Sequence, residues 1–96
     1  MKQLLTLNLP PSHEDRIIDY LLELEYVEGF SSYPVRGHGD HEHLTVAEQV
    51  SGRRQRLQVE MVMEENDIPS LLAGLRDDVG SDIVFWVMPV LKHGRV

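Results

Sequence analysis

Apolar and polar residues alternate in two segments of the chain, and this period of two predicts two β-strands with one buried face each. The first segment is 2–9, where Thr6 and Asn8 form the polar face. The second is 55–63, where Gln58 and Glu60 form the polar face. The apolar positions of the two segments are Leu5, Leu7, Leu9, Leu57, Val59, Met61 and Met63.

Apolar residues recur at helical spacing in two further segments, which predicts two amphipathic helices. We expect Ser12 to be the N-cap of the first helix and Glu28-Gly29 to mark its end. We expect Asp67 to cap the second helix and Gly80 to terminate it. The apolar stripes are Ile17, Ile18, Leu21, Leu22 and Leu24 in the first helix and Ile68, Leu71, Leu72, Leu75 and Val79 in the second.

Two more strands complete the pattern. Residues 30–36 predict a strand in which Pro34 has no N–H to donate, so this strand is expected at a sheet edge or at a bulge. It pairs antiparallel with 55–63 as a long hairpin. Residues 83–88 are continuously apolar, as expected of a central strand covered on both sides. The element order β-α-β-β-α-β predicts the α+β ferredoxin-like fold, with two helices on one face of a four-stranded antiparallel sheet.

The other face of such a sheet is bare in a single chain. The predicted strands hold more apolar residues than one covered face needs, since Trp86 and its neighbours from Val84 to Met88 point both ways. We therefore expect copies of the chain to associate through the open face, with Trp86 packed between subunits.

The connection at 37–52 is long for so small a domain, and long connections are often functional. It holds three of the five histidines within six positions, next to two carboxylates. Imidazole suits divalent transition metals near neutral pH, and carboxylates can complete or orient such a site. The sequence therefore predicts a copper, zinc or nickel site; a solvated polar loop without a ligand is the alternative. The candidate metal residues are His38, His41, His43, Asp40 and Glu42.

Charge narrows the choice of partners. The formal net charge is −7, which argues against nucleic acid, because binding to phosphates needs a concentrated basic surface. Arginines nevertheless gather around the long connection, where two glycines would let a phosphate approach the backbone. An anion site is the functional interpretation, and solubilising charge at a strand entrance is the bland one. The candidate anion residues are Arg36, Gly37, Gly39, Arg53, Arg54 and Arg56.

The remaining composition excludes several classes. There are no cysteines, which rules out disulfides, thiolate metal sites and a cysteine nucleophile. No apolar run is long enough for a signal peptide or a membrane span, so we expect a cytoplasmic protein without membrane insertion. No phosphate-loop, dinucleotide or serine-nucleophile motif is present, so we expect no enzymatic activity.

The stretch Val35-Arg36-Gly37-His38-Gly39 resembles the start of the T-loop in the nitrogen regulatory PII family. The whole chain is similar to an uncharacterised family of PII-like proteins with the motifs S-Y-P-V-x-G-H-G and A-E-Q-V-x-G-R-R, here Ser32–Gly39 and Ala47–Arg54. More distantly it resembles CutA. Members of the PII-like family are often encoded beside heavy-metal efflux pumps of the resistance-nodulation-division type.

The resemblance implies one PII-like domain over 1–96, with a T-loop-like segment at 37–52 and assembly into a homotrimer. It also implies a membrane heavy-metal efflux transporter as the regulated partner. In PII proteins an adenine nucleotide binds in the cleft between subunits. The second glycine-rich element of that cleft differs here, because Gly80-Ser81-Asp82 carries no lysine. A metal-responsive regulator is thus the first functional hypothesis, and a sensor of ATP, ADP or AMP is the alternative.

Overall fold

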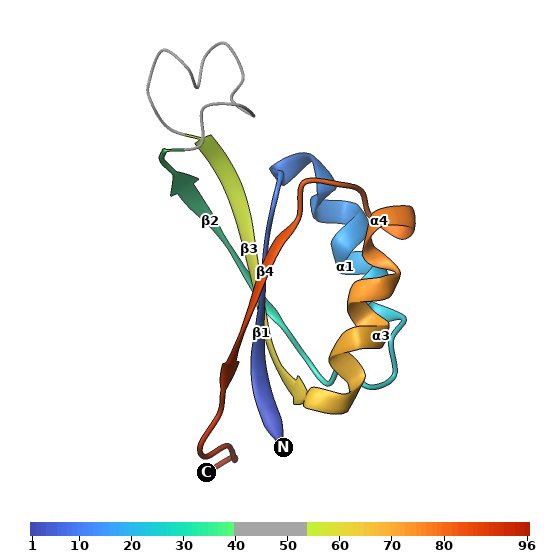
Figure 1. The fold of residues 1–96 in the computed structure, drawn as a ribbon, viewed down its shortest axis with the longest axis vertical. Helices are drawn as coiled ribbons and strands as arrows, with labels where there is room; N and C mark the ends of the chain where they lie inside the picture. Colours follow the sequence, from blue (N-terminus) through green and yellow to red (C-terminus); the bar gives the residue numbers. More distant parts are fainter. Residues whose placement is uncertain (40–53) are drawn as a thin grey trace.

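The computed structural model describes residues 1–39 and 54–96 (Figure 1). Strands and helices follow one another in the predicted order. A short 3-10 turn precedes each of the two helical segments. The strands are β1 (Lys2–Leu9), β2 (Ser31–Gly37), β3 (Arg54–Glu64) and β4 (Val84–Pro89). The helical elements are η1 (Pro11–His13), α1 (Glu14–Leu22), η2 (Glu65–Asp67), α3 (Ile68–Ala73) and α4 (Leu75–Asp78).

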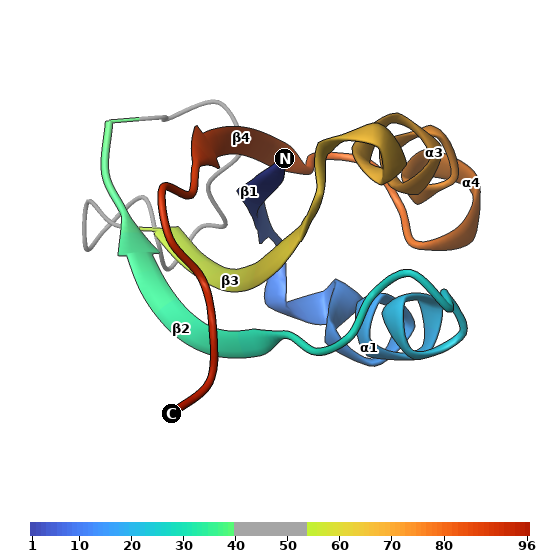
Figure 2. The ribbon, with the colours of Figure 1, turned by 90° about the horizontal axis from the view of Figure 1, so that it is seen from below.

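The four strands form one antiparallel sheet in the order β2-β3-β1-β4. Figure 2 shows α1, α3 and α4 together on one side of this sheet, with no helix on the other side. The α+β ferredoxin-like prediction is therefore confirmed, as is the antiparallel pairing of β2 with β3. Pro34 lies in β2 at the sheet edge, as its missing N–H predicted.

The hydrophobic core lies between the sheet and the helices. Leu5, Leu7 and Leu9 are fully buried there, and the register places them beside the apolar face of β3. From the helices, Ile17 and Leu71 are equally buried. Complete burial of one such side chain stabilises a fold by about 1.5–3 kcal/mol, so the alternation of β1 and β3 largely decides which side of the sheet receives the helices.

The first helix differs from the prediction at both ends. Ser12 lies inside η1 and is not the N-cap; His13 precedes the helix and makes no capping side-chain bond. The helix ends at Leu22, well before Glu28. Residues 24–27 leave the helical path because their apolar side chains turn back onto the core, and the chain continues through tight backbone turns there.

The second helix is interrupted at Gly74. The Tyr20 hydroxyl donates to the Leu71 carbonyl at 2.7 Å, which is the acceptor that an unbroken helix would offer to the N–H of Leu75. A Cβ on Gly74 would collide with the same hydroxyl. Asp67 precedes α3 as predicted, but it makes no side-chain capping bond. No helix in the described parts of the chain has the length and apolar character needed to cross a membrane.

The prediction of a central, doubly covered strand at 83–88 is wrong for the single chain. β4 lies at the edge of the sheet and pairs only with β1. Its side chains are well exposed, from 37% for Val87 to 53% for Met88, with Trp86 at 39%. The helices cover mainly β1 and β3, and the edge strand β4 lies at the margin of the helical layer. An apolar edge strand of this kind is incompletely buried by its own chain.

Candidate functional site

The candidate site is built where the long connection between β2 and β3 leaves the sheet. Gly37 pairs with Arg54 in the register of the two strands. A Cβ on Gly37 would lie 3.7 Å from both the Cβ of Arg54 and the Cγ of Arg56, so all three residues share one face. His38 is exposed, and Gly39 has a φ of 94°, a left-handed conformation that favours glycine.

Arg56 is the most deeply buried charge of this site, with only 3% of its surface exposed. Its Nε donates to Asn8 Oδ1 at 2.6 Å, and its Nη1 donates to Asp82 Oδ2 at 3.0 Å. Its Nη2 donates to the backbone carbonyls of Asn8 and Asp82, each at 2.8 Å. A guanidinium stays ionised at any ordinary pH, so these bonds and the opposite charge must offset the cost of removing it from water.

Asp82 joins the two arginines. Its Oδ2 accepts from Arg54 Nη2 as well as from Arg56 Nη1. Arg54 is itself 8% exposed. The backbone of Asp82 has a φ of 63°, in the left-handed region that aspartate tolerates better than most residues. This conformation turns a residue from the approach to β4 toward the beginning of β3, and so connects the two strands outside the sheet ladder.

The first turn of α1 holds the connection that carries Asp82. Arg16 Nη1 donates to the Val79 carbonyl at 3.1 Å. His13 Nε2 lies 3.1 Å from the Ser81 carbonyl, and because a carbonyl only accepts, Nε2 is the protonated nitrogen. Gly80 has a φ of 147°, and a Cβ there would lie 2.6 Å from His13 Nε2. The site therefore depends on contacts that begin in the helical layer.

A chain of polar side chains extends the site across the open face of the sheet. Asn8 Nδ2 donates to Gln58 Oε1 at 3.0 Å, and Gln58 Nε2 donates to Tyr33 Oη at 2.8 Å. Together with Arg56 and Asp82, these residues form a continuous path of hydrogen bonds from β2 through β3 and β1 to the turn before β4. Each amide oxygen and nitrogen in this path has one assigned partner, which fixes the orientation of both amides.

The sequence profile of one protein family matches residues 1–96, and its description is "Protein of unknown function (DUF3240)". The chain belongs to the DUF3240 family. It is also similar to a solved structure described as a DUF3240 family protein from Shewanella baltica, with 26% sequence identity and a TM-score of 0.82. That similarity covers 99% of this chain and 96% of the other. Among curated proteins, none matches. The DUF3240 fold is thus shared over the full length of both chains.

The predicted metal residues of this DUF3240 chain fall mostly outside the described structure. His38 lies directly after β2 and is exposed. Asp40, His41, Glu42 and His43 lie outside the described residues. Within 1–39 and 54–96, no three His, Asp or Glu side chains are grouped so that they could hold a metal ion.

The predicted anion residues divide into two groups. The DUF3240 structure brings Gly37, Arg54 and Arg56 together on the open face. Arg36 lies on the opposite face of β2, because successive strand residues alternate and Arg36 pairs with Gln55. Gly39 follows the strand end, and Arg53 lies outside the described residues.

Asn8 and Asp82 belong to the site, although the sequence pattern does not point to either. Asn8 is one polar position of an alternating strand, and a carboxamide beside an arginine is a natural partner for it. Asp82 stands in the Gly80-Ser81-Asp82 run, which resembles no known anion-binding motif as it stands. The signal in the sequence is an acid two residues after Gly80, together with Arg54 and Arg56, which form the one arginine pair of the sequence at i, i+2 spacing.

Proposed function

We propose that this DUF3240 protein is a PII-like regulatory protein of the cytoplasm that acts by binding rather than by catalysis. Its loop between β2 and β3 binds a transition metal through His38, His41 and His43, with Asp40 or Glu42 assisting. The metal state of this loop modulates a membrane heavy-metal efflux system. The observation that carries the proposal is the position of the histidine cluster, which starts one residue beyond Gly37, the strand partner of the buried Arg54.

The physical reason lies in how the loop is attached. Gly37 and Arg54 are paired strand residues, so both ends of the connection are held at one place on the sheet. Arg56 and Asp82 tie that place to the turn before β4. Bonds from a metal ion to several histidines of the loop would fix its course relative to this anchor, and ordering a segment is a common way to create a surface for a partner.

We propose further that the protein acts as a homotrimer. The support is the exposed apolar strand β4, where Trp86, Phe85 and Met88 are 39–53% exposed in the single chain. A strand whose large apolar side chains are exposed to this extent is usually part of an interaction surface. The measurement is the molar mass in solution by light scattering after size exclusion; a mass of one chain would contradict the proposal.

The metal proposal is tested by calorimetric titration of the untagged, metal-free protein with zinc, copper and nickel. We expect binding that disappears when His38, His41 and His43 are all replaced by alanine. His93→Ala is the matched control, because it removes an exposed histidine from the C-terminal tail and should leave the affinity unchanged. Equal affinity of the triple variant and the unmodified protein would reject the metal site.

A second candidate function is the sensing of an adenine nucleotide, and the position of Arg54 and Arg56 beside Gly37 on one face favours it. Charge-assisted bonds from guanidinium groups are strong and well matched to phosphate. A ligand that binds only the folded state raises the melting temperature by mass action. ATP, ADP and AMP are therefore each tested by thermal melting. A shift with one of them that persists in the triple histidine variant would favour this alternative over the metal proposal.

A further inference from the structure

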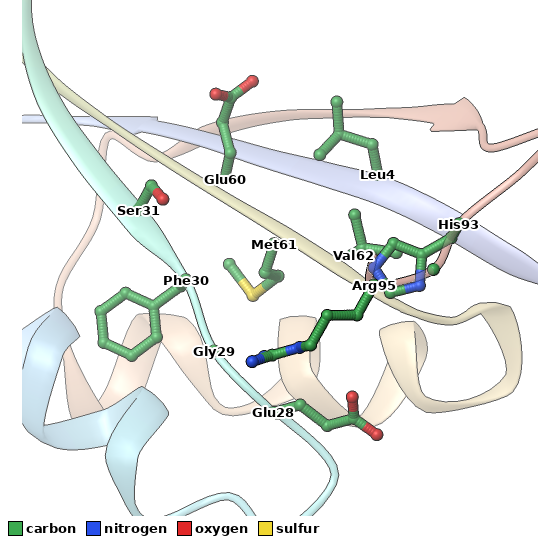
Figure 3. Close-up of a pocket in the computed structure, with 11 residues that line it drawn as sticks. Leu4, Glu28, Gly29, Phe30, Ser31, Glu60, Met61, Val62, His93 and Arg95 are labelled. Atoms are coloured by element: carbon green, nitrogen blue, oxygen red, sulfur yellow. The ribbon is translucent and has the colours of Figure 1, made fainter.

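A second region of the structure lies at the opposite end of the sheet from the long connection. There a cavity of about 650 Å³ opens beside β1 and β3, within the size range of ligand and peptide sites (Figure 3). Leu4 and Val62 contribute apolar surface, and the acidic residues Glu28 and Glu60 also line the cavity. The C-terminal tail, residues 90–96, closes one side through His93 and Arg95.

The tail makes little use of its own chain. Val90 donates its N–H to the Lys2 carbonyl at 3.3 Å, and every residue after it is exposed. Leu91 is 97% exposed. Its basic side chains, Lys92 and Arg95, make no hydrogen bond or ion pair with the described residues. The tail thus spans the cavity without filling it.

The carboxylates of the cavity are equally unused. Among residues 1–39 and 54–96, neither Glu28 nor Glu60 has an ion-pair partner, although both line the cavity that Arg95 borders. Figure 3 shows the Arg95 side chain extending over the cavity while the Glu60 carboxylate points away from it. The cavity therefore offers apolar surface flanked by negative charge, and the tail offers an apolar side chain flanked by positive charge.

We propose that the cavity receives the C-terminal tail of a second copy of this chain. Leu91 of the incoming tail covers the apolar surface at Leu4 and Val62, and its Lys92 and Arg95 pair with Glu28 and Glu60. Because each copy carries both a cavity and a tail, the contact is head-to-tail, and it closes into a ring where the rotation between neighbouring copies brings the last copy back to the first. The inference rests on the self-assembly included in the proposed function, and adds the segment that holds neighbours together.

Charge favours this exchange between copies. The chain carries a net charge of −7, so two copies repel each other unless a basic segment of one meets an acidic region of the other. The tail supplies two of the nine Lys and Arg residues within its last five positions. Opposite charges across an interface steer association and select the partner.

The first test uses the absence of cysteine from the chain. His93→Cys is placed in one chain and Glu60→Cys in a second chain that carries a tag of different mass, and the two are mixed under mild oxidation. We expect a disulfide-linked species containing one chain of each size. A disulfide that forms only when both cysteines are in the same chain would overturn the proposal, and so would no bond in either arrangement.

The second test reverses charge. Lys92→Glu with Arg95→Glu, and separately Glu28→Lys with Glu60→Lys, should each lower the mass in solution toward that of one chain. All four changes in one chain restore the opposition of charge and should restore the assembly. Glu14→Lys with Glu23→Lys, at exposed residues at the two ends of α1, is the control and should change nothing. Assembly unaffected by either reversal rejects the tail contact.

The outcomes separate this inference from the proposed function. A trimer that binds metal but keeps its mass after removal of residues 91–96 would refute the tail contact alone. A single-chain mass for the unmodified protein would refute self-assembly and the tail contact together, and the metal titration would then decide the rest of the proposed function independently.

Discussion

The charged side chains at the two ends of the sheet differ in whether they are paired within the chain. At the end where β2 and β3 leave the sheet, Arg54 and Arg56 are at most 8% exposed and are bonded to Asp82 from the same chain. At the other end, Glu60 and Arg95 line one cavity and make no ion pair with described residues. At the first end the charged side chains are paired within the chain. At the second end the charged side chains are available to pair with another molecule.

This difference teaches how to separate structural from available charge. Removing a charge from water is costly, so a buried arginine needs fixed partners, and any ligand that approaches it must replace or extend those bonds. Charges in an open cavity remain in contact with water, so this desolvation cost does not apply to them, and pairing with an incoming opposite charge is favourable. Stability should therefore depend on the first end and assembly on the second.

The largest expected effect comes from Arg56→Met, which keeps an unbranched apolar side chain but removes the guanidinium with its charge and its bonds. It leaves Asn8 Oδ1 without its donor and Asp82 with one cation fewer. We expect a loss of about 3–5 kcal/mol in unfolding free energy, the usual cost of breaking a buried ion pair. Urea denaturation measures it. Arg36→Met, at an exposed residue of β2, is the matched control with an expected change below about 0.5 kcal/mol.

Gly80→Ala should have the next largest effect. The new Cβ would lie 2.6 Å from His13 Nε2, and alanine does not readily adopt a φ of 147°. We expect a destabilisation of about 1–3 kcal/mol by urea denaturation, from strain and from movement of the turn that carries Asp82. Gly29→Ala serves as the comparison, because nothing lies within 4 Å of a Cβ there. Equal effects of the two substitutions would show that the His13 contact does not hold the turn.

Asp82→Asn isolates the role of charge at the first end. Asparagine also tolerates the left-handed backbone conformation and keeps an oxygen acceptor, so only the negative charge between the two guanidiniums is lost. We expect a destabilisation of about 1–3 kcal/mol, measured by urea denaturation. Asp82→Ala should cost more, since it also removes the acceptor. If both variants matched the unmodified protein in stability, the cluster would not be a structural anchor.

The smallest effect is expected at the second end, from the exposed pair between the Met1 amine and Glu64, which are 3.2 Å apart. Hydrogen bonding to the amine lowers the pKa of Glu64 from 4.5, and the same contact raises the pKa of the amine from 8.0. The Glu64 contribution is present above pH 4.5 and lost as pH falls through its lowered pKa. The amine contribution is present below pH 8.0 and lost as pH rises through its raised pKa.

Glu64→Gln should therefore lower the melting temperature slightly between about pH 4.5 and pH 8.0 and converge with the unmodified protein outside that window. Melting curves collected across this range measure the difference. A difference that persists at low pH would assign the effect to something other than ionisation of Glu64.

The sequence predicted the fold well because its signal is local. In β1 and β3 a period of two places the buried leucines and methionines on one side, and the helix stripes follow the same logic with a longer period. The helix ends were predicted less well. Ser12 had the right chemistry for a cap, but the chain forms a 3-10 turn there, and Tyr20 interrupts the second helix from a distance in sequence that no local pattern reports.

The site was predictable only in part for the same reason. Arg54 and Arg56 could be recognised, since they stand near the long connection and near two glycines. Their partner Asp82 lies 26 residues beyond Arg56 and reaches it through a left-handed backbone conformation that the sequence does not encode in any pattern. For β4, an apolar run reports burial but not by which chain, so a central position and an edge that awaits a partner give the same signal.

The polar path from Tyr33 to Asp82 has a consequence for how the chain finds its strand pairing. The hydrophobic alternation of β1 and β3 excludes a slip of one residue, because such a slip would turn the leucines outward. It does not exclude a slip of two, which returns every side chain to its proper face. A slip of two would, however, separate Arg56 from Asn8 and Asn8 from Gln58. The charged guanidinium of Arg56 would then lie on the sheet without these partners. The hydrogen bonds across the open face thus distinguish the native strand register from a slip of two residues, which the burial of apolar side chains alone would allow.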